Sequence, residues 1–492
     1  MSRSISFISK LYFKLQIFCL FLLLIYLTFQ FFLSESVYLE SDKYNFFFNN
    51  IIIFSVLLLS CLVYFFLKKN DKKINYFIIH FSTIFSLFLL NLLIEISLLN
   101  FSKDNLIAQF EKKGVIWDHR TRDEVINDLK IETGKENIYK SANPTGFIIG
   151  NIAEKIDFRT NIVPLSNISN STIVHCNETG VWRNYKSDKF GFNNPDDIIK
   201  INPKYNLVLI GDSFIEGVCV NGGEDIGSKL RSLNYNLLNL GKAGGGVASA
   251  IARLREYKHA YNFKSEFIIF FFYSYNDVTD TFEDYNHPFF KKYLDDKNFS
   301  QDLRNRQDEI DDHWKRFFSI SSQKDFLIKH PELKKHGQTY ILPNRSFNYK
   351  LFLKKVFLLT NIRAFIYDSL VARISNRKSK EKKQQLDILK KAFLSLKAEV
   401  NEIDNNTKLL LVYLPSHNEL TDKKQYLRKE INNLTNELNI DFINIYDFFV
   451  HMDINDLFYY GLSGHYSSKG YKILAEIIDK DLLKRTTNIN TN

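Results

Sequence analysis

After residue 200, the chain contains four residues that are suited to chemistry on acyl groups. They are, in chain order, Ser213, Gly244, Asn276 and His465. A serine hydroxyl becomes a strong nucleophile when a base takes its proton, and an imidazole can do this near neutral pH. Attack on an ester carbonyl places negative charge on oxygen, which backbone N–H groups and an uncharged amide can stabilise. A glycine at position 244 would let the backbone approach a substrate closely.

Three of these four residues follow a short apolar run that predicts a buried strand. Such runs lie at residues 206–210, 236–240, 267–273, 409–414 and 440–445. Helical patterns lie between them, at residues 225–233, 247–261, 386–400 and 423–438. Strands that alternate with helices predict an α/β fold, in which a parallel sheet is covered by helices on both faces. The carboxyl ends of its strands would then bring the reactive residues together.

The order of these sequence blocks resembles that of the SGNH (GDSL) hydrolase family. The resemblance covers residues 206–278 and 405–480. It includes Gly-Asp-Ser-Phe at 211–214, Asn-Leu-Gly at 239–241 and, upstream, Gly-Phe at 191–192. It implies a flavodoxin-like, three-layer fold with a parallel sheet between helices, and a reaction that needs neither a cofactor nor a metal.

The resemblance also implies a role for each reactive residue. Ser213 would be the nucleophile and His465 its base. The backbone N–H groups of Ser213 and Gly244 and the side-chain amide of Asn276 would form the oxyanion hole.

One position departs from the family pattern. Members usually carry an Asp three residues before the histidine, which fixes the tautomer of the imidazole, but here that residue is Leu462. Asp453 and Asp456 lie upstream and are possible substitutes, and a backbone carbonyl could also orient the ring. Without any acid, Ser213 and His465 would form a dyad. The acid of a triad contributes up to about 10⁴ in rate, so its absence would leave a slow enzyme or an inactive descendant.

The first hundred residues contain three apolar runs, at 15–33, 44–67 and 74–94, none of which has a charged residue. A helix needs roughly 20 residues to cross a bilayer, so we expect three transmembrane helices with lipid around residues 15–94. Seven Lys and Arg flank one side of these segments and four the other. The positive-inside rule then places the N-terminus in the cytoplasm. Everything after residue 100 would face the periplasm or outside of an inner (cytoplasmic) membrane.

The cysteines bear on this location. Cys19 and Cys61 lie in apolar runs, where they act as small apolar residues. Cys176 and Cys219 fall in the expected exported part, and two thiols in an oxidising compartment favour a disulfide. The alternative is two unrelated buried thiols.

Composition and length suggest several parts and no nucleic-acid partner. The net charge is +10, but the basic residues are dispersed or lie beside the apolar runs. The densest basic run, 377–391, has apolar spacing that fits an amphipathic helix with a solvated face. We expect a membrane anchor at 1–100, an accessory region at 101–200 that packs on the hydrolase, and a hydrolase domain at 201–492. A helical insertion would occupy about 278–385.

These features favour a serine esterase that removes acyl groups, such as O-acetyl groups, from an extracytoplasmic glycan or a related ester. An O-acyltransferase for envelope polysaccharide would use the same Ser213 acyl-enzyme, with a sugar hydroxyl in place of water. A third possibility is a non-catalytic glycan-binding descendant of the fold. The sequence leaves these three alternatives open.

Overall fold

The computed structural model describes residues 2–33, 53–100, 103–149, 162–199, 203–261, 264–321, 352–353, 355–356, 359–362, 377–404, 406–422 and 427–487. The described residues divide into two compact units. One is drawn from Met1–Leu106 and Asn344–Glu381, and the other from Ile107–Pro343 and Lys382–Asn492. The reactive residues predicted from the sequence all belong to the second unit.

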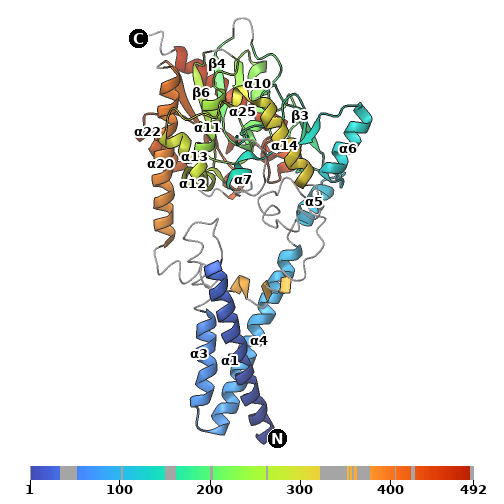
Figure 1. Ribbon diagram of the computed structural model, residues 1–492, viewed down its shortest axis with the longest axis vertical. Helices are drawn as coiled ribbons and strands as arrows, with labels where there is room; N and C mark the ends of the chain where they lie inside the picture. The colour runs from blue at the N-terminus through green and yellow to red at the C-terminus, as the bar shows by residue number, and fades with distance from the viewer. Residues whose placement is uncertain are drawn as a thin grey trace. The chain divides into compact units, whose positions relative to one another are not determined.

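A five-stranded parallel sheet forms the centre of the second unit (Figure 1). Its strands lie in the order β5-β4-β6-β7-β8, and every neighbouring pair is parallel. Their bounds are β4 (Asn206–Ile210), β5 (Asn236–Asn239), β6 (Phe267–Tyr273), β7 (Lys408–Leu414) and β8 (Asp441–Asn444). In this order the chain direction along the sheet reverses after β5, which opens a crevice at the carboxyl ends of β4 and β6.

Side chains that alternate along each strand pack into two separate cores, one on each face of the sheet. On β4, Val208 and Ile210 join one core while Leu207 and Leu209 join the other. The first core is covered by α11 (Val247–Tyr257), α14 (Gln307–Ser321) and α20 (Arg377–Ile403), and the second by α10 (Ile226–Ser232) and α25 (Ser468–Thr487). The predicted α/β fold, with a parallel sheet between two layers of helices, is confirmed.

The remaining helices of this unit are short. They are α6 (Arg122–Thr133), α7 (Pro144–Ile149), α9 (Ser213–Glu216), α12 (Asp277–Asn286), α13 (Pro288–Asp295), η2 (Leu303–Asn305), α21 (His417–Asp422), α22 (Arg428–Glu437), α23 (Tyr446–Phe449), α24 (Ile454–Leu457) and η4 (Tyr459–Gly461). The helix α5 (Lys103–Lys112) contains the boundary between the two units. The helix predicted at 423–438 is thus α22, and residues 423–426 lie outside the described residues.

The region before the main sheet forms a second, smaller sheet. It contains β1 (Ile138–Lys140), β2 (Thr172–Cys176) and β3 (Arg183–Lys186), with β1 parallel and β3 antiparallel to β2. The helix α6 packs on this sheet through Val125 and Ile126. The small sheet belongs to the same compact unit as the main sheet.

The other unit contains three apolar helices, α1 (Ser2–Leu33), α3 (Ile53–Phe66) and α4 (Asn70–Asn100), which pack together (Figure 1). Two of them, over Ser4–Tyr26 and Asn70–Ser97, are long and apolar enough to cross a membrane. The described part of the run predicted at 44–67 gives only the shorter apolar helix Phe54–Phe66. Large apolar side chains on the outer surfaces of these helices are exposed, among them Leu15, Phe18, Phe85 and Leu93.

The segment predicted as one insertion, 278–385, is divided between the two units. The helices from α12 to α14 pack on the main sheet unit. Some of the described residues between 352 and 362 instead bind α4: the amide of Asn91 donates to the Lys355 carbonyl over 3.2 Å, and that of Asn361 donates to Glu95 over 2.9 Å. Asn91 and Glu95 are buried polar residues in an apolar helix, and this segment supplies their hydrogen-bond partners.

Candidate active site

Ser213 lies at a sharp turn between a strand and a helix. The strand β4 ends at Ile210, and Ser213 begins the short helix α9 two residues after Gly211. The carboxylate of Asp212 caps this helix by accepting the Phe214 N–H over 2.9 Å. The helix ends at Gly217, whose φ of +80° favours glycine. The turn therefore presents the Ser213 hydroxyl at the carboxyl edge of the sheet.

Ser213, His465 and Glu178 form a hydrogen-bonded series. Nε2 of His465 lies 2.8 Å from Oγ of Ser213, and its Nδ1 lies 2.6 Å from Oε2 of Glu178. An ionised carboxylate can only accept, so Nδ1 carries the proton. Nε2 is then free to accept the proton of the Ser213 hydroxyl. This is the arrangement of nucleophile, base and orienting acid that serine hydrolases use.

The carboxylate beside Nδ1 of His465 differs from the sequence prediction, because it belongs to Glu178 and not to Asp453 or Asp456. Asp453 is an N-cap of α24 and accepts the Asn455 N–H over 2.9 Å. Asp456 forms a salt bridge with Lys469 over 2.6 Å. Both carboxylates are held by partners on the C-terminal segment.

Sequence reasoning missed Glu178 because it lies 287 residues before His465, in the expected accessory region. One signal could have pointed to it. Glu178 stands two residues after Cys176, and Cys219, the expected partner of that cysteine, stands six residues after Ser213. A disulfide between them would bring Glu178 close to the nucleophile.

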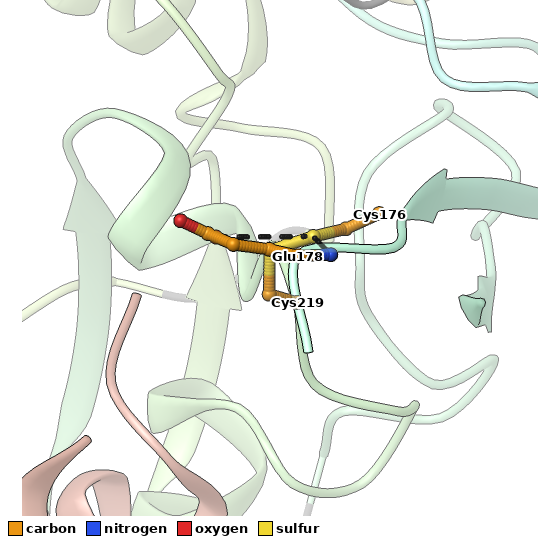
Figure 2. A group of neighbouring side chains, drawn as sticks. All are labelled: Cys176, Glu178 and Cys219. Carbon is orange, nitrogen blue, oxygen red and sulfur yellow. Dashed lines mark hydrogen bonds between the residues drawn. A yellow bond between two sulfur atoms is a disulfide. The ribbon is translucent and has the colours of Figure 1, made fainter. Parts of the chain in front are cut away.

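That disulfide is present in the structure. Cys176 at the end of β2 and Cys219 in the loop after α9 are joined across 43 residues. The Glu178 side chain extends alongside the bond (Figure 2). Among the described residues, these three form the one group of His, Cys, Asp or Glu close enough to share a metal ion. The group does not suit a metal, because sulfur atoms joined to each other lack the thiolate charge that a metal binds.

The environment of His465 sets its basicity. Burial by itself would lower the pKa of this imidazole, but the negative charge of Glu178 and the hydrogen bond from Nδ1 outweigh burial. The pKa of His465 is therefore raised above its ordinary value. The charge on Glu178 makes the imidazole a stronger base for the Ser213 proton.

Asn276 lines the same cavity as Ser213 and His465, a space of about 400 Å³. Its side-chain nitrogen donates to Asp280 over 2.7 Å, and this bond fixes the orientation of the amide. The same nitrogen also donates to Asp212 over 3.4 Å, a longer bond that a substrate oxygen would have to displace. Further residues that line the cavity are Phe214, Tyr273, Tyr275, Ser416, His417, Asn418, Ser463 and Gly464.

Gly244 lies in the loop after β5, which is the neighbour of β4 in the sheet. Its φ is +77°, and a Cβ at this position would lie 2.9 Å from Oδ1 of Asn143. Both the backbone conformation and the close approach require glycine. Gly244 is not one of the residues that line the cavity, so its predicted role as an oxyanion donor stays a prediction.

A buried ion pair connects the nucleophile turn to the Gly244 loop. Glu216, three residues after Ser213, accepts from Lys242 over 2.5 Å, from the Ala243 N–H over 2.7 Å and from Tyr185 over 2.8 Å. Burial by itself would raise the pKa of Glu216, but the Lys242 charge and these hydrogen bonds outweigh burial and lower it. Glu216 is therefore ionised, and it holds the two loops together.

No protein-family model and no curated protein matches this chain. The hydrogen-bonded series of Ser213, His465 and Glu178 is therefore the feature of this chain that points to a function.

Proposed function

We propose that this protein is an SGNH-type serine esterase that acts on acyl esters through a Ser213 acyl-enzyme. The observation that carries the proposal is the continuous series from Ser213 Oγ through the two nitrogens of His465 to Glu178, at 2.8 and 2.6 Å. The turn after β4 and the cavity in front of it support the same proposal. The acid at Nδ1 argues against a non-catalytic descendant, because a binding protein has no use for an oriented base.

The reaction follows from this geometry in two halves. Ser213 Oγ attacks the ester carbonyl carbon while its proton moves to Nε2 of His465, and the Asn276 amide stabilises the oxyanion. The C–O bond of the leaving alcohol then breaks as Nε2 returns the proton to that alcohol, which leaves acyl-Ser213. In the second half a water molecule gives a proton to Nε2 and attacks the acyl carbon. The bond from that carbon to Ser213 Oγ then breaks as Nε2 returns the proton to Oγ, which releases the carboxylic acid and restores Ser213 and His465.

The proposed substrate is an acyl ester, such as an O-acetyl ester, on an extracytoplasmic glycan. The wall of the cavity combines polar side chains, Ser416, Asn418 and Ser463, with the aromatic rings of Phe214, Tyr273 and the exposed Tyr275. Polar side chains beside aromatic faces suit a sugar ring. An acyltransferase would differ only in the second half, where a sugar hydroxyl would replace water.

The test uses the full chain purified in detergent. A fluorophosphonate probe should label Ser213, and Ser213→Ala should abolish both labelling and hydrolysis of a small acetate ester. Labelling that survives in Ser213→Ala, or an unlabelled wild-type chain without activity, would contradict the proposal. Mass analysis of the products from an acetate ester and added oligosaccharide then distinguishes acetate release from acetyl transfer.

We further propose that the chain is a multi-pass protein of the inner membrane with the esterase outside it. The apolar helices and the Lys and Arg distribution support this location, and so does the disulfide, which reducing compartments disfavour. Alkaline phosphatase, which needs export, should be active when fused after Asn492 and inactive when fused after Asn70. The reverse pattern would place Ser213 in the cytoplasm.

A further inference from the structure

The acid of the proposed triad does not come from the sheet that carries the nucleophile. Ser213 and His465 lie beside β4 and α25 of the main sheet, whereas Glu178 follows β2 of the small sheet. Glu178 itself lies in a turn, beyond the last residue of β2 that pairs with a neighbouring strand. Strand pairing therefore does not fix the position of its carboxylate relative to His465.

The disulfide contacts the acid from both of its sulfur atoms. The backbone N–H of Glu178 donates to Cys176 Sγ over 3.3 Å. The other sulfur, Cys219 Sγ, lies 2.8 Å from Oε2 of Glu178 and 3.4 Å from Nδ1 of His465. One sulfur therefore holds the start of the turn, and the other lies against the Glu178 carboxylate (Figure 2) and against Nδ1 of His465.

The Cys219 end of the link is itself held in an unusual conformation. Its φ is +71°, in the left-handed region that residues other than glycine rarely adopt. Its backbone N–H donates to Nδ1 of His175 over 3.2 Å, and His175 is the residue before Cys176. Burial lowers the pKa of His175 to about 3, so this ring stays neutral and can accept. Two adjacent residues of β2 thus hold Cys219, one covalently and one by a hydrogen bond.

We propose that the Cys176–Cys219 disulfide positions the catalytic acid, so that the two cysteines are positioning residues of the esterase reaction. The bond joins the turn that carries Glu178 to the loop that follows Ser213, and it sets the carboxylate against Nδ1 of His465. The inference rests on the proposed function. It makes the accessory region part of the active site, and it makes full activity depend on disulfide formation.

The experiment is a double-mutant cycle on the full chain. The double variant Cys176→Ala/Cys219→Ala, the single variant Glu178→Gln and the triple variant that combines them are compared with the wild type. A disulfide that acts only through Glu178 predicts that the double variant loses turnover by the same factor as Glu178→Gln. It also predicts that the triple variant loses no more than Glu178→Gln alone, because the effects of a single pathway do not add.

The pH profile separates positioning from general stability. Loss of Glu178 from Nδ1 should move the acid limb of kcat/KM to lower pH, since Glu178 raises the pKa of His465. The cysteine variant should show the same shift, and a merely loosened fold would not move the limb in that direction. Wild-type turnover and pH profile in the cysteine variant would overturn the inference, as would a triple variant that loses the product of the two separate factors.

A second measurement covers the case in which the cysteine variant does not fold. Folded wild type is treated with dithiothreitol, which gives two electrons and two protons to the S–S bond and closes to its own disulfide. Turnover should fall as mass analysis shows Cys176 and Cys219 converted to thiols, in addition to the free Cys19 and Cys61, and should return on reoxidation. Full activity with both thiols free would overturn the inference. A wild-type chain that neither hydrolyses esters nor reacts at Ser213 would overturn the proposed function, and this inference with it.

Discussion

Replacement of Glu178 by Gln tests the acid directly, because it removes the charge and nearly preserves the shape. A hydrogen bond to a charged group contributes about 1.5–3 kcal/mol, which corresponds to roughly 10–150-fold in rate. The full effect of a triad acid reaches about 10⁴-fold. The Glu178 side chain is 28% exposed, so solvent screens part of its charge. We therefore expect kcat to fall by about 10²–10³, between these limits.

The assay is hydrolysis of a small acetate ester by the full chain across pH. The reaction needs neutral His465, so kcat/KM rises as pH passes the pKa of this imidazole. Glu178 raises that pKa, and its loss should move the rise to lower pH. The same pKa difference affects folding. The ion pair stabilises the wild type fully below the unfolded pKa of histidine, and this contribution is lost as pH rises through the raised folded pKa.

Asp456→Asn is the matched control. It also neutralises an acid near the C-terminal histidine, but Asp456 forms its salt bridge with the exposed Lys469. Surface pairs of this kind contribute about 0–1 kcal/mol, so we expect turnover close to that of the wild type. If Glu178→Gln kept wild-type turnover while Asp456→Asn lost it, the assignment of the acid would be wrong.

Three further substitutions test the surroundings of the triad. Asn276→Ala should reduce kcat by about 10²–10³ with little change in KM, and an unchanged kcat would remove it from the oxyanion hole. Gly244→Ala should lower the melting temperature, because its φ of +77° and the 2.9 Å approach to Asn143 leave no room for a Cβ. Lys242→Met should lower the unfolding free energy by about 3–5 kcal/mol in denaturant titrations, since it leaves Glu216 buried and ionised without its partner. An equal effect from replacing an exposed lysine would contradict that last prediction.

The sequence by itself predicts the central sheet and three of the residues around the cavity. The apolar runs that became β4, β6 and β7 are bounded by glycine or other turn residues, so local pattern is sufficient to identify them. Parallel strands place their carboxyl ends along one edge. Ser213 and Asn276 therefore come together once the strands are identified. The sequence predicts a role for His465 because this residue precedes the last helix and matches the histidine of the family pattern.

Only the tertiary structure shows which carboxylate lies beside His465. Glu178 belongs to a different sheet from Ser213 and reaches His465 across 287 residues, and neither strand periodicity nor motif spacing extends that far. The nearer candidates, Asp453 and Asp456, are closer in sequence, but they are held by Asn455 and Lys469. Side-chain contacts between distant segments depend on how separate elements pack, and here the Cys176–Cys219 disulfide joins the two segments. Local sequence pattern predicts the strands and the position of Ser213, whereas the proposed triad with Glu178 is visible only in the folded chain.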